Sequence, residues 1–75
     1  MISGVDLEDW DKGAPTELYN VPRDTYVETV DTGWRVLFHH IDGMYSFCHD
    51  VASGEVCHLR AWTDVYPLKE KNEEV

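Results

Sequence analysis

The hydrophobic and polar positions divide the chain into a polar beginning, a middle with short apolar runs, and a charged end. In the middle, runs rich in β-branched and aromatic residues predict five β-strands, at residues 25–30, 34–41, 44–51, 55–60 and 64–68. Breaks that contain Gly, Asp or Ser separate these runs. Short strands at such even spacing indicate an all-β domain.

The breaks also predict how the strands are connected. Asp42-Gly43 predicts a two-residue hairpin loop, and Ala52-Ser53-Gly54 predicts a three-residue loop with its glycine in the left-handed conformation. Residues 61–63 predict a short 3₁₀ turn, and Pro67 places the fifth strand at a sheet edge or a strand end. This order is typical of a small five-stranded antiparallel SH3-like barrel or a bent meander. A flat antiparallel sheet with one covering helix is the alternative.

The polar ends set the predicted domain limits. Residues 1–17 predict an acidic N-terminal arm, residues 18–68 the small β-barrel domain, and residues 69–75 a charged and frayed tail. Residues 16–20 fit one helical turn that is capped by Thr16 and stops before Pro22.

The two predicted loops also set an expected register. If Asp42-Gly43 forms the first loop, Leu37 pairs with Cys48 and Val36 pairs with His49. Successive side chains then alternate between two faces. The face expected to cover the core carries Trp34, Val36, Phe38, His40, Tyr45, Phe47, His49, Val51, Cys57 and Leu59. The other face is mixed, with Leu37, His39, Ile41, Met44, Ser46, Cys48, Val56, His58 and an expected Arg35–Asp50 ion pair.

The stretch CHDVASGEVCH, residues 48–58, repeats a Cys-His pair and therefore suggests a metal site or a disulfide. In the expected register Cys48 lies opposite His58, and His49 lies opposite Cys57. The two cysteines then fall on opposite faces, so a disulfide between them would need the register to slip by one residue.

The same register argues against a four-ligand zinc site, because adjacent Cys and His side chains on a strand cannot converge on one ion. The remaining metal candidate is the set His39, Cys48 and His58 on the mixed face. The paired-ligand spacing typical of zinc sites is missing. We therefore expect no bound metal and no cofactor.

A thiol beside a histidine also suggests a cysteine nucleophile, either Cys48 with His58 or Cys57 with His49. Such a nucleophile needs an electropositive pocket, and a sheet of this size leaves little room for a cleft. The chain has no Gly-rich phosphate loop either. We therefore expect no enzymatic activity.

The charge of the chain bears on its partners. Fifteen acidic and six basic residues give a net charge of −9. This field repels phosphate backbones and anionic membranes, and it attracts basic protein surfaces. We expect the contact residues in the acidic arm, with Trp10 as an aromatic anchor among Asp6, Glu8, Asp9 and Asp11. The alternative is that the charge serves only solubility.

The N-terminal sequence lacks the features of a signal peptide, and no apolar stretch reaches the length of a membrane span. Two cysteines in such a chain are typical of free thiols in a reducing compartment. We expect the protein in the cytoplasm.

Three segments, His39–Ser46, Val56–Leu59 and Ala61–Val65, resemble a pattern found in small uncharacterised proteins of tailed bacteriophages. An upstream element, Val21–Thr25, belongs to the same pattern, which covers residues 18–66. The resemblance implies a viral accessory protein made in the cytoplasm of a bacterial host. It transfers no catalytic residue.

These observations favour a small acidic accessory protein that binds and modulates or inhibits a host or viral protein. A sharper form of this hypothesis is nucleic-acid mimicry, in which carboxylates stand in for phosphates. The alternative is a structural or assembly component of a virion that oligomerises through its mixed sheet face. A metal-binding protein or thiol enzyme is the least supported class.

Overall fold

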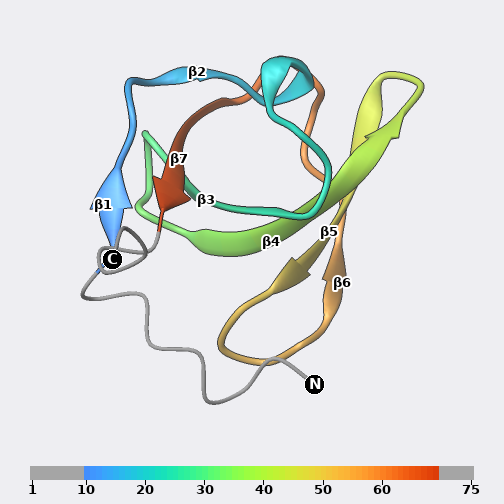
Figure 1. Cartoon of the computed structure of the whole chain (residues 1–75). Coiled ribbons are helices and arrows are strands. Elements are labelled where there is room, and N and C mark those ends of the chain that lie inside the picture. The colour runs from blue at the N-terminus through green and yellow to red at the C-terminus, as the bar shows by residue number, and fades with distance from the viewer. Residues whose placement is uncertain (1–9, 70–75) are drawn as a thin grey trace.

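A computed structural model describes residues 10–69, which fold as a strongly curved antiparallel sheet (Figure 1). The strands of this part of the chain are β1 (Asp11–Lys12), β2 (Thr16–Glu17), β3 (Thr25–Thr29), β4 (Arg35–Asp42), β5 (Tyr45–Asp50), β6 (Val56–Cys57) and β7 (Asp64–Lys69). One 3₁₀ turn, η1 (Leu18–Asn20), follows β2. The predicted all-β class is confirmed.

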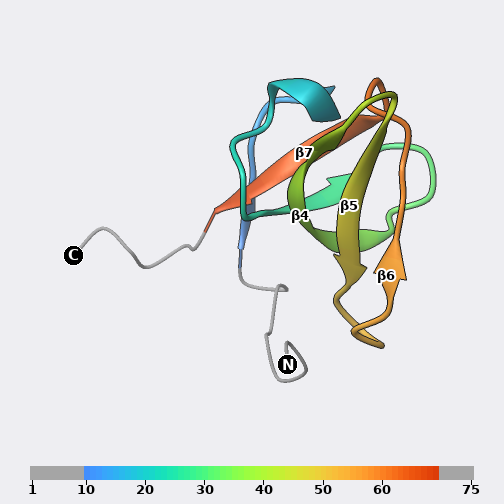
Figure 2. The same ribbon diagram turned by 90° about the vertical axis from the view of Figure 1, so that its right-hand side faces the viewer.

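The strands run in the order β1-β7-β3-β4-β5-β6, and β2 also pairs with β7. The last strand therefore lies beside the first long strand, β3. Both views place η1 at one end of the curved sheet (Figures 1 and 2). There the backbone N–H of Tyr19 donates to the carbonyl of Ala61 at 2.9 Å, and the N–H of Ala61 donates to the carbonyl of Met44 at 2.9 Å. Backbone hydrogen bonds thus join η1 to the turn between β4 and β5.

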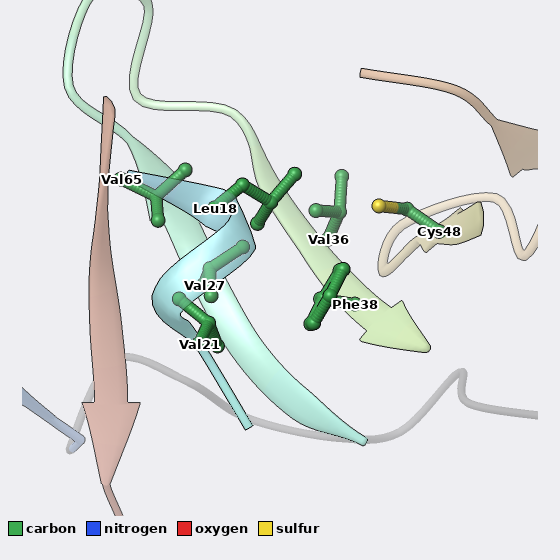
Figure 3. Close-up of a cluster of buried hydrophobic side chains, with 7 residues drawn as sticks. All are labelled: Leu18, Val21, Val27, Val36, Phe38, Cys48 and Val65. Carbon is green, nitrogen blue, oxygen red and sulfur yellow. The ribbon is translucent and has the colours of Figure 1, made fainter. Parts of the chain in front are cut away.

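The core lies inside this curve (Figure 3). Its buried cluster comprises Leu18, Val21, Val27, Val36, Phe38, Cys48 and Val65. Each apolar side chain of this size contributes about 1.5–3 kcal/mol when it is fully buried. Leu18 comes from η1, and the other members lie on or beside the long strands, so the 3₁₀ turn fills one end of the core.

The first described residues pair with β7. Asp11 lies opposite Lys69, Thr16 lies opposite Val65, and the N–H of Gly13 donates to the carbonyl of Pro67 at 2.7 Å. Residues 11–12 and 16–17 of the predicted arm are therefore strands of the sheet. The helical turn predicted at residues 16–20 is shorter in the structure, where it corresponds to η1. Glu17 precedes η1, and its side chain makes no capping hydrogen bond.

The prediction that Pro67 lies in an edge strand or at a strand end is wrong, because β7 lies between β3 and the β1–β2 segment and continues to Lys69. The carbonyl of Pro67 points toward Gly13, between the end of β1 and the start of β2. The nitrogen of Pro67, which has no proton to donate, faces this same interruption. A proline is tolerated in a paired strand where the neighbouring ladder is broken. The predicted 3₁₀ turn at residues 61–63 is a simple turn.

The register of β4 against β5 differs from the predicted register. Asp42 pairs with Tyr45, so the loop is Gly43-Met44 instead of Asp42-Gly43. Gly43 has a φ of 67°, which suits the first position of a type II′ turn. A β-bulge between Phe38 and His40 then shifts the pairing once more. A shift of one residue moves side chains to the other face of a strand.

This shift changes which residues reach the core. Val36 and Phe38 are buried as predicted, but Ser46 and Cys48 face inward from β5 in place of Tyr45, Phe47 and His49. Tyr45 and Trp34 of the predicted core face are exposed. The loop after β5 starts earlier than predicted, because Asp50 bonds to Glu55 across it. Gly54, with a φ of 79°, takes the left-handed position as expected.

The predicted Arg35–Asp50 ion pair does not form. Arg35 Nε lies 2.9 Å from Glu28 Oε1, and Lys12 Nζ lies 2.9 Å from Glu28 Oε2. Asp50 instead accepts hydrogen bonds from its own loop, at the N–H of Ala52 and the hydroxyl of Ser53. Burial raises the pKa of Glu28, but hydrogen bonds and charges from the two cations outweigh it and lower the pKa overall. The sequence pattern did not indicate this cluster, in which Glu28 and Arg35 are cross-strand partners and Lys12 joins them from β1.

Candidate functional site

A set of exposed residues lies in the segments that hydrogen-bond around Ala61 at one end of the sheet. We call it the end patch, and it comprises Tyr19, Met44, Tyr45, Arg60 and Trp62. Its four apolar side chains are 46–62% exposed. The backbone bonds around Ala61 bring its segments together, and a β-bridge places Tyr45 opposite Arg60. The guanidinium carbon of Arg60 lies 5.9 Å from the centroid of the Trp62 ring.

Two carboxylates border the end patch. Asp42 lies directly opposite Tyr45 across the hairpin. The hydroxyl of Tyr19 donates to Glu17 Oε1 at 2.6 Å, and this hydrogen bond together with the charge of Glu17 raises the pKa of Tyr19. Aromatic rings attract cations through their faces, and carboxylates pair with them directly. The end patch therefore has groups that suit Lys or Arg side chains of a partner.

A histidine face occupies the outer side of β4 and β5. It comprises His39, His40, His49 and His58 around Phe47. All four histidine rings of the chain lie within 5.4–5.9 Å of the Phe47 ring, measured between centroids. The β-bulge in β4 brings both His39 and His40 to this side. The close spacing of four histidines in the sequence was a signal for the cluster, but the bulge could not be read from the pattern.

Hydrogen bonds orient three of these rings. Asp24 Oδ1 lies 3.2 Å from His39 Nδ1, and His39 Nε2 lies 2.9 Å from His49 Nδ1. Asp24 has a φ of 59°, a left-handed conformation that aspartate adopts more readily than most residues. His58 Nδ1 lies 2.9 Å from the carbonyl oxygen of Ser46. A carbonyl can only accept, so His58 donates from Nδ1.

The structure separates the three members of the candidate metal set His39, Cys48 and His58. His39 and His58 lie on the outer face beside Phe47, whereas Cys48 is buried in the core and points toward Val36 and Phe38 (Figure 3). Across residues 10–69, no group of three or more His, Cys, Asp or Glu side chains is placed to hold a metal ion. The cause is the register, which turns Cys48 inward.

The two cysteines are direct neighbours, contrary to the prediction that they lie on opposite faces. Cys48 is the cross-strand partner of Cys57, and His49 is the partner of Val56. Both thiols are free. Burial raises the pKa of Cys48, and burial together with the neighbouring Cys48 raises the pKa of Cys57 to about 11. A raised pKa lowers the thiolate fraction, which disfavours either cysteine as a catalytic nucleophile.

The predicted contact residues of the arm are only partly described. Asp6, Glu8 and Asp9 lie outside the described residues. The Trp10 ring packs edge-on against Tyr26, with 5.2 Å between ring centroids and an angle of 81°. Asp11 lies in β1. Trp10 therefore packs against the outer side of the sheet, whereas the prediction placed it as an aromatic anchor in a polar arm.

A groove with a volume of about 490 Å³ lies between β1, β7 and the start of β3. Its lining includes Lys12, Pro22, Thr25 and Leu68. We assign no ligand to it.

Comparisons with protein-family models, with curated proteins and with solved structures found no significant match. Within residues 10–69, no helix has the length and apolar character needed to cross a membrane.

Proposed function

We propose that the protein is a protein-binding module that binds a basic segment of its partner at the end patch. The observation that carries this proposal is the exposure of Tyr19, Met44, Tyr45 and Trp62, whose segments are joined by backbone hydrogen bonds at one end of the sheet. Tyr, Trp and Met are enriched in protein–protein interfaces, and Tyr and Trp are common energetic hot spots. Glu17 and Asp42 at its border supply the negative charge that a Lys- or Arg-containing segment needs.

The charge of the whole chain supports a basic partner. The net charge of −9 steers positively charged surfaces toward the protein during diffusion. Six of the fifteen acidic residues lie in residues 1–9 and 70–75, so a large part of this field arises outside the described sheet. In this proposal the acidic residues speed the encounter, and the end patch makes the contact.

The biological role that we propose is modulation or inhibition of the bound protein, which is in keeping with the viral accessory protein that the bacteriophage-like pattern implies. Nucleic-acid mimicry is less well supported by the described carboxylates. Glu28 is already paired with Lys12 and Arg35, and Asp50 is engaged by its own loop. The aromatic character of the end patch favours a protein ligand over a surface that imitates phosphates.

A matched pair of tryptophan variants tests the proposal, because Trp62 lies in the end patch and Trp34 lies exposed at the start of β4. Wild type, Trp62→Ala and Trp34→Ala would be immobilised for capture from a bacterial lysate. Each captured protein would then be tested as a purified partner. Loss of a hot-spot side chain weakens binding by roughly tenfold or more. We expect that loss for Trp62→Ala and near wild-type binding for Trp34→Ala.

Peptides provide a second readout that needs no captured protein. Short peptides that alternate Arg with aliphatic residues would be titrated into ¹⁵N-labelled protein, with Gln-for-Arg peptides as the control. Shifts centred on the Trp62 indole and the Tyr45 amide, reduced in Glu17→Gln/Asp42→Asn, would support the proposal. Equal shifts with the Gln peptides, or binding that Trp62→Ala leaves intact, would refute it.

One observation favours the assembly role as a second candidate. Among the described strands, β6 ends the sheet order, and its Val56 is 49% exposed. An exposed edge strand can pair with a second copy. This role predicts a defined oligomer by light scattering at micromolar concentration that Val56→Lys converts to monomer. A wild-type monomer under these conditions would argue against it.

A further inference from the structure

The cross-strand cysteines carry an inference that is independent of the end patch. Cys48 and Cys57 are directly opposite residues of β5 and β6. The Cα atoms of opposite residues in an antiparallel pair lie about 4.5–5.5 Å apart, and disulfides span Cα distances of about 4.4–6.8 Å. The backbone of the hairpin therefore already has the spacing that a disulfide needs.

Hydrogen bonds on both sides hold this register. The N–H of Ser46 donates to the carbonyl of Leu59 at 2.8 Å, and the N–H of Asp50 donates to the carbonyl of Glu55 at 2.8 Å. Each bond lies two residues from the cysteine pair along β5. The pair is thus enclosed by ladder bonds and cannot drift out of alignment without breaking them.

The two thiols differ in access to solvent. Cys48 is 0% exposed, and its Sγ lies 3.2 Å from the hydroxyl oxygen of Ser46. Cys57 is partly exposed. These are the only two cysteines in the chain, so no other thiol of the same molecule competes for either. Cys57 is therefore the more accessible of the two thiols to a dissolved oxidant, and the partner of the buried Cys48 across the strands is Cys57.

We propose that Cys48 and Cys57 form a site of reversible oxidation, closing a disulfide between β5 and β6 when a low-molecular-weight disulfide is present. The Cys57 thiolate attacks one sulfur of the reagent, a mixed disulfide forms, and one thiol of the reagent leaves. The Cys48 thiolate then attacks Cys57 Sγ, so the mixed disulfide breaks and a second reagent thiol leaves. The protein loses two electrons and two protons, which reduce the reagent to two thiols.

The raised pKa of both thiols limits the rate of this reaction. Because the thiolate is the attacking species, oxidation is slow at neutral pH and its rate rises by about tenfold per pH unit below the thiol pKa. A cross-link at this position would restrain β6 and the segment that leads from Cys57 to Arg60. Closing a loop stabilises a protein mainly by restricting the unfolded chain, so the oxidised form should melt at a higher temperature.

The test uses the full chain and oxidised glutathione at pH 8, with mass spectrometry and thiol titration of the products. Wild type should become a monomer that has lost two hydrogens, carries no glutathione and has no titratable thiol. Dithiothreitol should restore both thiols. Cys48→Ser should end with one glutathione on Cys57, and Cys57→Ser should keep a free thiol on Cys48, because that side chain is buried.

Other outcomes in wild type would overturn the proposal. The first is a stable glutathione adduct on Cys57, and the second is an intermolecular dimer. The third is that the folded protein keeps two free thiols under conditions that oxidise the urea-unfolded chain. If a serine at the buried position prevents folding, the Cβ chemical shifts of Cys48 and Cys57 in wild type replace the variants. Both Cβ signals must move to the range of a disulfide on oxidation, and unchanged shifts would contradict the inference.

Discussion

Phe38 lies directly opposite Cys48 across β4 and β5. Both side chains are buried, at 1% and 0% exposure, so this pair defines the inward face of the hairpin. Its neighbours on the adjacent positions, Leu37 and His49, consequently face outward together. This one pairing places the cysteines in the core and the histidines on the outer surface.

Ser46 is buried in the inward row beside Cys48. Its hydroxyl donates to the carbonyl of Leu59 at 2.9 Å and accepts from the N–H of Leu59 at 3.1 Å. Ser46→Ala should lower the free energy of unfolding by about 1–3 kcal/mol, because it leaves the partly buried N–H of Leu59 without this partner. Urea unfolding followed by tryptophan fluorescence measures the change. Ser53→Ala, in an exposed loop, is the control and should lower the free energy of unfolding by less than Ser46→Ala does. An equal decrease for the two variants would contradict the role of Ser46.

Glu28 should make stability depend on acidic pH. Its folded-state pKa is lowered, so its contribution is present above the ordinary value of 4.5 and is lost as the pH falls through the folded pKa. Glu28→Gln should cost about 1–3 kcal/mol at pH 7, because hydrogen bonds to charged groups are worth this much. Between pH 5 and pH 3, wild type should lose more stability than this variant. Urea unfolding at both pH values checks the slopes, with Glu55→Gln expected to follow wild type.

His58 should be found in one tautomer when it is neutral. Because Nδ1 donates to the carbonyl of Ser46, the proton must be on Nδ1 and the lone pair on Nε2. Long-range ¹H–¹⁵N spectra of the imidazole ring distinguish the two tautomers directly. A neutral His58 with its proton on Nε2 would contradict the hydrogen bond. His40, for which the structure shows a ring contact with Phe47, provides a comparison within the same spectrum.

The Gly43-Met44 loop predicts unequal tolerance of alanine. Gly43 has a φ of 67°, where a Cβ costs about 1–2 kcal/mol, although nothing lies within 4 Å of the position that a Cβ would take. Gly43→Ala should therefore destabilise the protein by about this amount through backbone strain alone. Met44 is 62% exposed, so Met44→Ala should be close to neutral. Thermal unfolding of both variants measures this strain, and a Gly43→Ala variant as stable as wild type would contradict it.

Much of the strand content could be predicted from the sequence, because β-branched and aromatic runs separated by Gly-containing turns are local signals. Residues 25–30 and 64–68, for example, nearly match β3 and β7. The inclusion of Asp11–Lys12 and Thr16–Glu17 in the sheet could not be predicted, since two-residue strands have no period to detect. Their pairing depends on β7, which lies some fifty residues further along the chain.

The candidate site was harder to predict than the fold. The acidic arm could be predicted as a contact region because its charge is visible in the sequence. The end patch could not, because Tyr19, Met44 and Trp62 come from three separate segments. Each of these residues looks like an isolated apolar residue in a turn. Only the backbone bonds around Ala61 bring their segments to one end of the sheet.

The sequence by itself determined the all-β class, the positions of the long strands along the chain, and the turn position of Gly54. Only the tertiary structure decided the register, and with it the partner of Cys48 and the surroundings of the four histidines. The physical reason is that residues 34–41 carry apolar side chains on both alternating faces, so either face could have been buried. Packing of Phe38 with Leu18 and Val27 in the core, a bulge at His39, and the Gly43-Met44 turn selected one of them.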